Sequence, residues 1–267
     1  MEKADPAANA DSSALLRIES AGAVLTVGLN RPAKRNALND GIILAIQDCF
    51  VNLPDGIGAV VIHGIGDHFS SGLDLSELTE HDATDGLRHS QMWHRVFDRI
   101  QYSRVPVIAA LRGAVIGGGL ELACAAHIRV AEPSAYFALP EGQRGIFVGG
   151  GGSVRLPRLI GVARMMDMML TGRVYPATEG ASFGFAQYLT EEGNALAKSI
   201  ELAAQVAKNA PLTNFAVLQA LPMIAETNPQ SGLLMESLMA TVAQSDKEAK
   251  LRIRAFLERK TSKVKPS

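Results

Sequence analysis

Cysteine is scarce in this chain of 267 residues, where Cys49 and Cys124 are the two present and form no C-x-x-C spacing. A disulfide-based scaffold is therefore excluded, and a reducing, cytoplasmic compartment is expected. An excess charge of one sign is also lacking, because 26 Lys and Arg residues balance 27 Asp and Glu residues to a formal net charge of −1. This balance disfavours a partner held by bulk electrostatics, so no nucleic-acid partner is expected.

The sequence has no long uninterrupted hydrophobic run. Its most apolar region, residues 106–131, is broken by charged side chains and by the glycines at 117–119. A transmembrane helix needs about 20 nearly continuous apolar residues, so no membrane partner is expected. Residues 1–13 have no apolar stretch of signal-peptide length and are interpreted as a flexible leader. The six histidines show no metal-ligand spacing, and no metal is expected.

Apolar residues make up 47% of the chain and charged residues 20%, which suits a folded protein with a large core. Short β-branched runs bounded by glycine or proline alternate with stretches in which apolar residues recur every three or four positions. This alternation predicts an α/β fold. The predicted strands are 23–29, 58–63, 105–111 and 127–130, and the predicted helices between them are 36–51 and 86–103.

Strand signals fade after about residue 157, and the rest of the chain has helical periodicity. The expected helices are 162–171, 177–183, 194–209, 231–244 and 246–259, with a further helix starting at Pro211. We therefore predict four segments. They are the leader at 1–13, a core at 14–200, a C-terminal helical region at 201–260 and a polar tail at 261–267.

The strongest motif runs from Gly113 to Cys124 and contains Gly117-Gly118-Gly119 followed by Glu121. Glycines between a strand and a helix let a ligand approach the backbone closely, and the helix start offers unpaired N–H groups to a developing oxyanion. Glu121 then falls in the first helical turn. The alternative interpretation is close packing of helix and strand, with Glu121 complementing the helix dipole.

A second motif, Asp67-His-Phe-Ser-Ser71-Gly72-Leu73-Asp74-Leu75, also reads as a strand-to-helix passage. The Leu73 N–H is a candidate second donor beside the Gly118 N–H. The side chains of Ser71 and Asp74 are interpreted first as turn and N-cap residues.

The third motif places Glu141 after a short apolar strand and Pro140, ahead of the glycines at 149–152. Those glycines do not form a phosphate loop, because no Gly-Lys-Ser/Thr follows them. They also lack the clean preceding strand of a dinucleotide-binding unit.

In this order and spacing, the three motifs resemble those of the crotonase (enoyl-CoA hydratase/isomerase) superfamily. The resemblance extends from about residue 15 to 259. It includes further stretches at 29–38, 151–161, 170–173, 209–212 and 255–258.

The resemblance implies a spiral of ββα units with a helical C-terminal trimerisation region, and a homotrimer or dimer of trimers. It implies an acyl-CoA substrate whose thioester oxygen is held by the N–H groups of Leu73 and Gly118. Coenzyme A then arrives as part of the substrate, and no tightly bound cofactor is expected. Preorganised donors of this kind stabilise an enolate where its charge develops.

Hydratases of the superfamily use two glutamates, and this sequence has a carboxylate at both positions, Glu121 and Glu141. The resemblance thus implies an enoyl-CoA hydratase in which Glu141 exchanges a proton with water and Cα, while Glu121 orients and activates the attacking water. The alternatives are a Δ3-Δ2 enoyl-CoA isomerase, other enolate chemistry, or a non-catalytic acyl-CoA- or RNA-binding member. Isomerases commonly keep only the carboxylate at the Glu141 position.

By the same resemblance, coenzyme A would lie along residues 32–35 and the turn at 70–74. Lys34 and Arg35 are candidates to meet its phosphates, with Ser71 and Asp74 beside them, although both cations also suit a solvated loop. Leu73 stands where a smaller residue is common in the family. Gln143 and Arg144 stand where relatives are more apolar, which suggests either a polar acyl group or simple surface exposure.

Overall fold

The computed structural model describes residues 15–77 and 82–258, so the predicted leader at 1–13 and tail at 261–267 lie outside the described residues. The chain divides into two compact units, Met1–Ala207 and Lys208–Ser267. The sequence analysis set this boundary after residue 200, which is inside helix α8 (Ala195–Val206). The contacts place all of α8 in the first unit.

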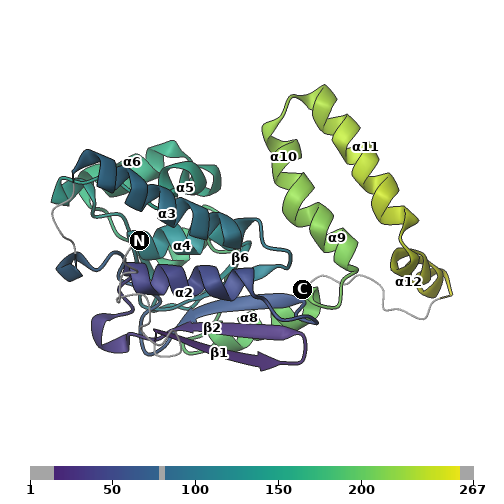
Figure 1. The fold of residues 1–267 in the computed structure, drawn as a ribbon, viewed down its shortest axis with the longest axis horizontal. Helices are drawn as coiled ribbons and strands as arrows, with labels where there is room; N and C mark the ends of the chain where they lie inside the picture. Colours follow the sequence, from purple (N-terminus) through teal and green to yellow (C-terminus); the bar gives the residue numbers. More distant parts are fainter. Residues whose placement is uncertain (1–14, 78–81, 259–267) are drawn as a thin grey trace, which may run out of the picture. The chain divides into compact units, whose positions relative to one another are not determined.

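A six-stranded sheet with the order β1-β2-β3-β4-β6-β9 forms the base of the first unit (Figure 1). Strands β1 and β2 are antiparallel, and each following pair is parallel. The strands are β1 (Leu16–Ala21), β2 (Val24–Leu29), β3 (Ala59–Gly64), β4 (Val107–Leu111), β6 (Ile128–Ala131) and β9 (Tyr188–Leu189).

A second, smaller sheet contains β5 (Ala114–Ile116), β7 (Tyr136–Ala138) and β8 (Tyr175–Pro176). The chain passes from β4 to β5 and into α4 (Gly118–Ala125), and then from β6 to β7 and on to α5 (Gly152–Ile160). Because β4 pairs with β6 and β5 with β7, consecutive ββα turns stack on one another. A single bridge from Ser70 to Val115 adds the turn that begins with β3. This is the predicted spiral.

Because the turns stack, residues that are far apart in the sequence lie close together at one end of the spiral. Leu73, Gly118 and Glu141 each follow closely on a segment that joins the second sheet. The corresponding points of successive turns lie one above another, so residues separated by more than 20 positions along the chain meet at the same end of the spiral.

The alternating side chains of the strands divide the core into two parts. On β3, Val60 and Ile62 pack with the helices on one face, whereas Ala59 and Val61 pack toward α8 on the other. This is the two-residue period of a strand buried on both faces. The helices on the first face include α2 (Asp40–Val51), α3 (Ala83–Gln101), α4 and α5. Figure 1 shows α2, α3 and α4 along that face.

Two further helices, α6 (Val162–Thr171) and α7 (Ala177–Ser182), precede α8 in the first unit. The second unit is helical, as predicted for the C-terminal region. It contains α9 (Pro211–Phe215), the π-helical turn η5 (Ala216–Ala220), α10 (Leu221–Glu226), α11 (Pro229–Ser245) and α12 (Lys247–Leu257). None of the helices in the described part of the chain is long and apolar enough to cross a membrane.

The predicted strands and helices are confirmed with small shifts of their ends, and α6 has the predicted bounds. The Asp67–Leu75 motif leads into a 3₁₀ turn, η3 (Leu75–Glu77), and the helix predicted at 86–103 corresponds to α3, which begins at Ala83. The Asp74 carboxylate accepts a hydrogen bond from Ser76 N in that turn at 3.1 Å, in agreement with its interpretation as a turn and N-cap residue, and it also pairs with cations from another segment.

Candidate active site

Two backbone N–H groups meet where α4 begins. A Cβ placed on Gly118 would lie 3.4 Å from Leu73 N, and one placed on Gly72 would lie 3.2 Å from Gly118 N. Neither the Leu73 N–H nor the Gly118 N–H donates a hydrogen bond to any acceptor within residues 15–77 and 82–258. Unpaired backbone donors cost free energy when buried, so this pair suits an external acceptor.

Backbone pairing, and not side-chain packing, fixes the direction of the Leu73 N–H. The residues on either side of it pair with Leu38: Leu38 N donates to Gly72 O at 2.7 Å, and Asp74 N donates to Leu38 O at 2.8 Å. Gly72 has φ = +88°, a conformation that favours glycine. The turn motif thus holds one donor, and the first residue of α4 supplies the other.

Glu141 follows the Leu139-Pro140 pair at the end of the second sheet and is 7% exposed. Its Oε2 atom is buried and has no hydrogen-bond partner among the residues that the structure describes. Burial raises the pKa of Glu141 to about 7, and the charge of Glu121 adds to this effect. A carboxyl group with such a pKa holds a proton near neutral pH and can donate it.

Glu121 lies in the first turn of α4 and is 4% exposed. Its Oε1 accepts hydrogen bonds from Gly150 N at 2.9 Å and Gly152 N at 2.7 Å. Burial raises the pKa of Glu121, while the N–H groups of Gly152 and Gly150 and the charge of Arg155 oppose that rise. The two glutamates therefore stand in different surroundings, one held by N–H donors and the other unpaired at Oε2.

The glycines at 149–152 have a function that the sequence analysis missed. A Cβ at Gly150 would approach Glu121 Oε2 to 3.1 Å, and one at Gly152 would approach Glu121 Cγ to 2.8 Å. Small residues are needed here because the loop wraps closely around the carboxylate. The glycine run was visible in the sequence and could be compared with known phosphate-binding loops. Its contact with Glu121, about 30 positions earlier in the chain, could not be recognised from the sequence.

One pocket of about 410 Å³ is lined by five predicted site residues: Ser71, Leu73, Gly118, Glu121 and Glu141. Trp93 on α3 also lines it and packs against Gly118. The lining also includes Gly86, His89, Ser90, Arg144, Ile146, Phe147 and Val148. Gln143 and Arg144 are exposed, as one of the two interpretations of these residues expected, and Arg144 also borders the pocket.

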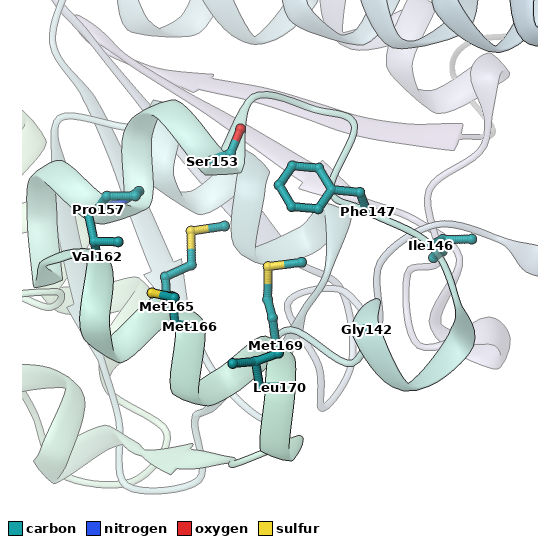
Figure 2. A pocket seen from close by; sticks show the side chains of 10 residues that line it. All are labelled: Gly142, Ile146, Phe147, Ser153, Pro157, Val162, Met165, Met166, Met169 and Leu170. Carbon is teal, nitrogen blue, oxygen red and sulfur yellow. The ribbon is translucent and has the colours of Figure 1, made fainter.

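A second pocket of about 490 Å³ lies beside the first and shares Ile146 and Phe147 with it. Its lining is almost entirely apolar and includes three methionines of α6. Figure 2 shows the side chains of Met165 and Met169 extending from α6 on the side of Phe147.

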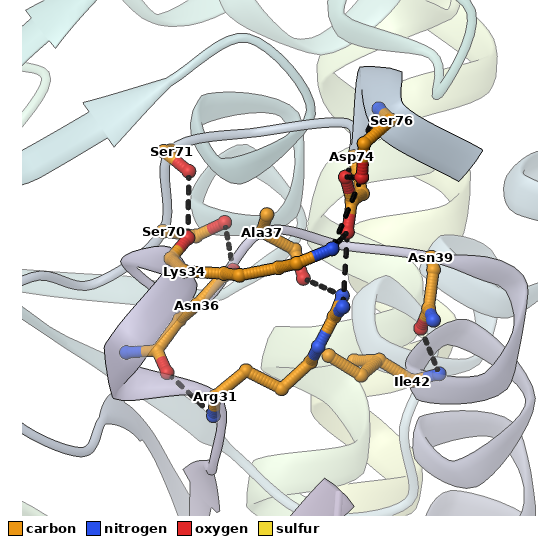
Figure 3. Close-up of polar contacts among 10 residues, drawn as sticks. All are labelled: Arg31, Lys34, Asn36, Ala37, Asn39, Ile42, Ser70, Ser71, Asp74 and Ser76. Carbon is orange, nitrogen blue, oxygen red and sulfur yellow. Dashed lines mark hydrogen bonds and ion pairs between the residues drawn. The ribbon is translucent and has the colours of Figure 1, made fainter. Parts of the chain in front are cut away.

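The structure brings the four residues predicted to bind coenzyme A together, but the Asp74 carboxylate is already engaged (Figure 3). Asp74 Oδ2 pairs with Arg31 Nη2 at 2.9 Å and Lys34 Nζ at 3.0 Å. The hydrogen bond from Ser76, followed by those from Lys34 and Arg31, holds the pKa of Asp74 well below its usual range. Asp74 therefore joins the 32–34 turn to the turn that carries Leu73.

Arg35 and Ser71 connect the same two turns through the backbone. Ser71 N donates to Arg35 O at 2.9 Å, and Ser71 Oγ donates to Lys34 O at 3.3 Å. The side chain of Arg35 is exposed, on a backbone with φ = +51°. Lys34 is about half exposed, with a side-chain exposure of 48%. Neither Lys34 nor Arg35 lines the 410 Å³ pocket.

The family model described as enoyl-CoA hydratase/isomerase matches residues 19–266. The chain belongs to the enoyl-CoA hydratase/isomerase family. The resemblance to the crotonase superfamily is therefore confirmed, together with the α/β spiral that it implied.

Relatives within this family carry hydratase names. A Bacillus subtilis (strain 168) protein described as a probable enoyl-CoA hydratase is 33% identical, over 94% of this chain and 97% of its own length. The 2,3-dehydroadipyl-CoA hydratase of Escherichia coli (strain K12) is also 33% identical, over 91% of this chain and 95% of its own.

Solved structures in the family agree in fold. A Rhodopseudomonas palustris CGA009 protein, proposed to be an enoyl-CoA hydratase, is 77% identical with a TM-score of 0.92, covering 96% of this chain and 98% of that one. A proposed enoyl-CoA hydratase from Thermobifida fusca YX, solved in complex with CoA, is 26% identical with a TM-score of 0.82 and covers 90% and 96%. Family members bind CoA thioesters, and within the described ranges of this chain no cluster of side chains suits a metal ion.

Proposed function

We propose that this protein is an enoyl-CoA hydratase that adds water across the α,β double bond of a trans-2-enoyl-CoA to give a 3-hydroxyacyl-CoA. The observation that carries the proposal is that two buried glutamates, Glu121 and Glu141, line the same pocket as Leu73 and Gly118, whose N–H groups are unpaired. An isomerase needs only one of these carboxylates, to move a proton between two carbons.

In the proposed reaction the thioester oxygen accepts hydrogen bonds from Leu73 N–H and Gly118 N–H. Glu121 takes a proton from water, the water oxygen bonds to C3, and the electrons of the C2–C3 double bond move toward the carbonyl to form an enolate. Glu141, in its protonated form, then delivers a proton to C2. Loss of the proton from Glu121 and its return to Glu141 through solvent restore both groups.

The different surroundings of the glutamates support these roles. The unpaired, buried Oε2 of Glu141 favours the neutral acid, whose pKa is raised to about 7. The N–H groups of Gly150 and Gly152 orient the Glu121 carboxylate and oppose, without cancelling, the rise in its pKa that burial causes. General acid–base steps of this kind contribute roughly 10²–10⁴-fold to rate.

The test follows loss of the conjugated enoyl-thioester absorbance with short, long, branched and aromatic enoyl-CoAs. The proteins are the wild type, Glu121→Gln and Glu141→Gln. We expect hydration on at least one class and a loss of roughly 10²-fold or more in each variant. Hydration that survives both substitutions would overturn the mechanism. A Glu121→Gln protein that loses hydration but interconverts 3-enoyl-CoA and 2-enoyl-CoA at the wild-type rate would point to an isomerase.

Coenzyme A is proposed to lie along residues 32–35, with Lys34 and Arg35 near its phosphates and Ser71 and Asp74 holding that segment in place. Replacing Arg35 by Ala should raise KM several-fold with little change in kcat, and more strongly at low salt. Arg17, an exposed arginine of β1 paired with Glu19, provides the control substitution. Equal KM values in the Arg35→Ala and Arg17→Ala proteins would remove Arg35 from the site.

We further propose a cytoplasmic homotrimer or dimer of trimers, assembled through the C-terminal helical unit. Support comes from the many large apolar side chains that this unit exposes, which include Leu233, Leu234, Leu238, Val242, Phe256 and Leu257. Sedimentation velocity should therefore give a mass of three or six chains. A single-chain mass across the micromolar range would contradict the proposal.

A further inference from the structure

The 149–152 loop, which holds Glu121, is in turn bonded to the side chain of Arg155. Arg155 lies one helical turn into α5 and is 8% exposed. Its Nη1 donates to Gly150 O at 3.0 Å, and Gly150 N is the group that donates to Glu121. The guanidinium thus fixes the carbonyl of the glycine whose N–H contacts the carboxylate.

Helix α3 anchors Arg155 in turn. Arg155 Nη2 pairs with Asp98 Oδ1 at 2.5 Å, and Arg155 Nε donates to Gln101 Oε1 at 2.5 Å. Ser90, also on α3, donates through Oγ to Gly149 O at 2.7 Å. Each of the three guanidinium nitrogens therefore donates to a protein acceptor, which fixes the orientation of the Arg155 side chain.

Arg155 also acts on Glu121 by its charge, since its positive charge opposes the rise in the pKa of Glu121 that burial causes. The other titratable groups near Glu121 come from several elements. They are Glu141 after β7, Cys124 on α4, and His94 and Asp98 on α3, His94 lying near Gly151 and Asp98 paired with Arg155. Unlike these groups, Arg155 is a buried arginine that donates a hydrogen bond to the loop around Glu121.

We propose that Arg155 is a positioning residue for the reaction: it fixes the 149–152 loop in the form that holds the Glu121 carboxylate in place and puts a positive charge next to that loop. This inference rests on the proposed function. Arg155 does not line the 410 Å³ pocket, so its effect is exerted through Gly150 and not on the substrate.

The test compares Arg155→Gln and Arg155→Lys with a matched control, Arg158→Gln, which alters an arginine of the same helix whose guanidinium bonds to Val154 O. We expect Arg155→Gln to lower kcat about 10- to 100-fold with little change in KM, because Glu121 is misplaced. The acid limb of its kcat/KM profile should move up by about one pH unit or more. Arg155→Lys should restore the position of the limb, and Arg158→Gln should match the wild type.

A purely structural role would lower thermal stability and activity without moving the acid limb, and that result would overturn the proposal. If Arg155→Gln does not fold, Asp98→Asn decides, because it removes one anchor of Arg155 and leaves the charge in place. It should lower kcat without shifting the limb. A wild-type kcat in Asp98→Asn would contradict the anchoring argument.

A readout independent of turnover separates this inference from the proposed function. Carbon-13 NMR titration of glutamate carboxyl groups, with the Glu121 signal assigned by its absence in Glu121→Gln, should show a higher pKa for Glu121 in Arg155→Gln than in the wild type. If no enoyl-CoA is hydrated but this shift is seen, the proposed function fails and the link from Arg155 to Glu121 stands. If hydration is seen without the shift, the inference fails alone.

Discussion

The carboxylate of Glu141 lies against the backbone of Gly117, where a Cβ would come within 2.6 Å of Oε1. Gly117 also has φ = +53° and ψ = −124°, a conformation that L-residues rarely adopt. The lack of space for a Cβ and the positive φ both require glycine at position 117, immediately before Gly118. The first glycine of the cluster thus provides space for the Glu141 carboxyl group, and the second provides an unpaired N–H group.

Replacing Gly117 by Ala should therefore lower kcat about 100-fold or more, because the added methyl group displaces the Glu141 carboxylate. Backbone strain should also cost about 1–3 kcal/mol of stability. The matched control is Gly22→Ala in the β1–β2 turn, where φ is +58° and nothing lies within 4 Å of the added Cβ. It should lose stability and keep full activity. Steady-state kinetics measure kcat, and thermal melts measure stability. Similar kcat losses in both variants would contradict this account.

The pH dependence of activity should carry the signature of Glu141. Burial raises its pKa to about 7, and the proposed acid step needs the protonated form. We expect kcat/KM to fall as pH rises through about 7 in the wild type. The residual activity of Glu141→Gln should lack this alkaline limb. A wild-type profile that stays flat to pH 9 would argue against Glu141 as the acid.

The stability of the protein should change with pH in the same range. Between the ordinary glutamate pKa of about 4.5 and the folded value of about 7, the folded state binds the extra proton, so stability falls as pH rises. Glu141→Gln removes the charge and should raise the free energy of unfolding at pH 8 by about 1–3 kcal/mol, with little difference at pH 4. Urea unfolding at both pH values measures this. A destabilised variant at pH 8 would contradict the prediction.

Asp74 should behave in the opposite sense, since its partners lower its pKa. Its stabilising contribution is present above the ordinary aspartate pKa and is lost as pH falls toward the folded value. Asp74→Asn should cost about 1 kcal/mol or more at pH 7 and less at pH 3, because Arg31 and Lys34 lose their shared acceptor. Asp48→Asn, on an exposed face of α2, is the control for urea unfolding. An equal loss at both pH values would show that charge is not the cause.

The sequence predicted that the two glutamates and both backbone donors belong to one site, and the structure places all four residues in one pocket. A glycine cluster and a turn drew attention to the donors and to Glu121, whereas the role predicted for Glu141 came from the resemblance to the crotonase superfamily. It also located the longer strands and helices, whose periodicity is strong. β1 was missed, since most of its side chains are exposed and it lacks a buried run. The two-residue strands β8 and β9 were missed because they are too short to show a period.

The contacts that support the site were beyond local reasoning. Arg155 and Gly150 are close in sequence, but Asp98 and Glu121 come from other turns of the spiral. Only the stacking of the turns brings them together. The engagement of Asp74 by Arg31 was hidden in the same way, because 43 positions separate the two residues.

The bridge between Leu38 and Leu73 also has a consequence for how such a protein can diversify. Main-chain bonds on both sides of Leu73 set the direction of its N–H, while its side chain borders the pocket. Mutation at position 73 can therefore reshape the space for the acyl group and leave the donor in place. The side chain of this residue can change with the substrate, while its backbone N–H group keeps the same position.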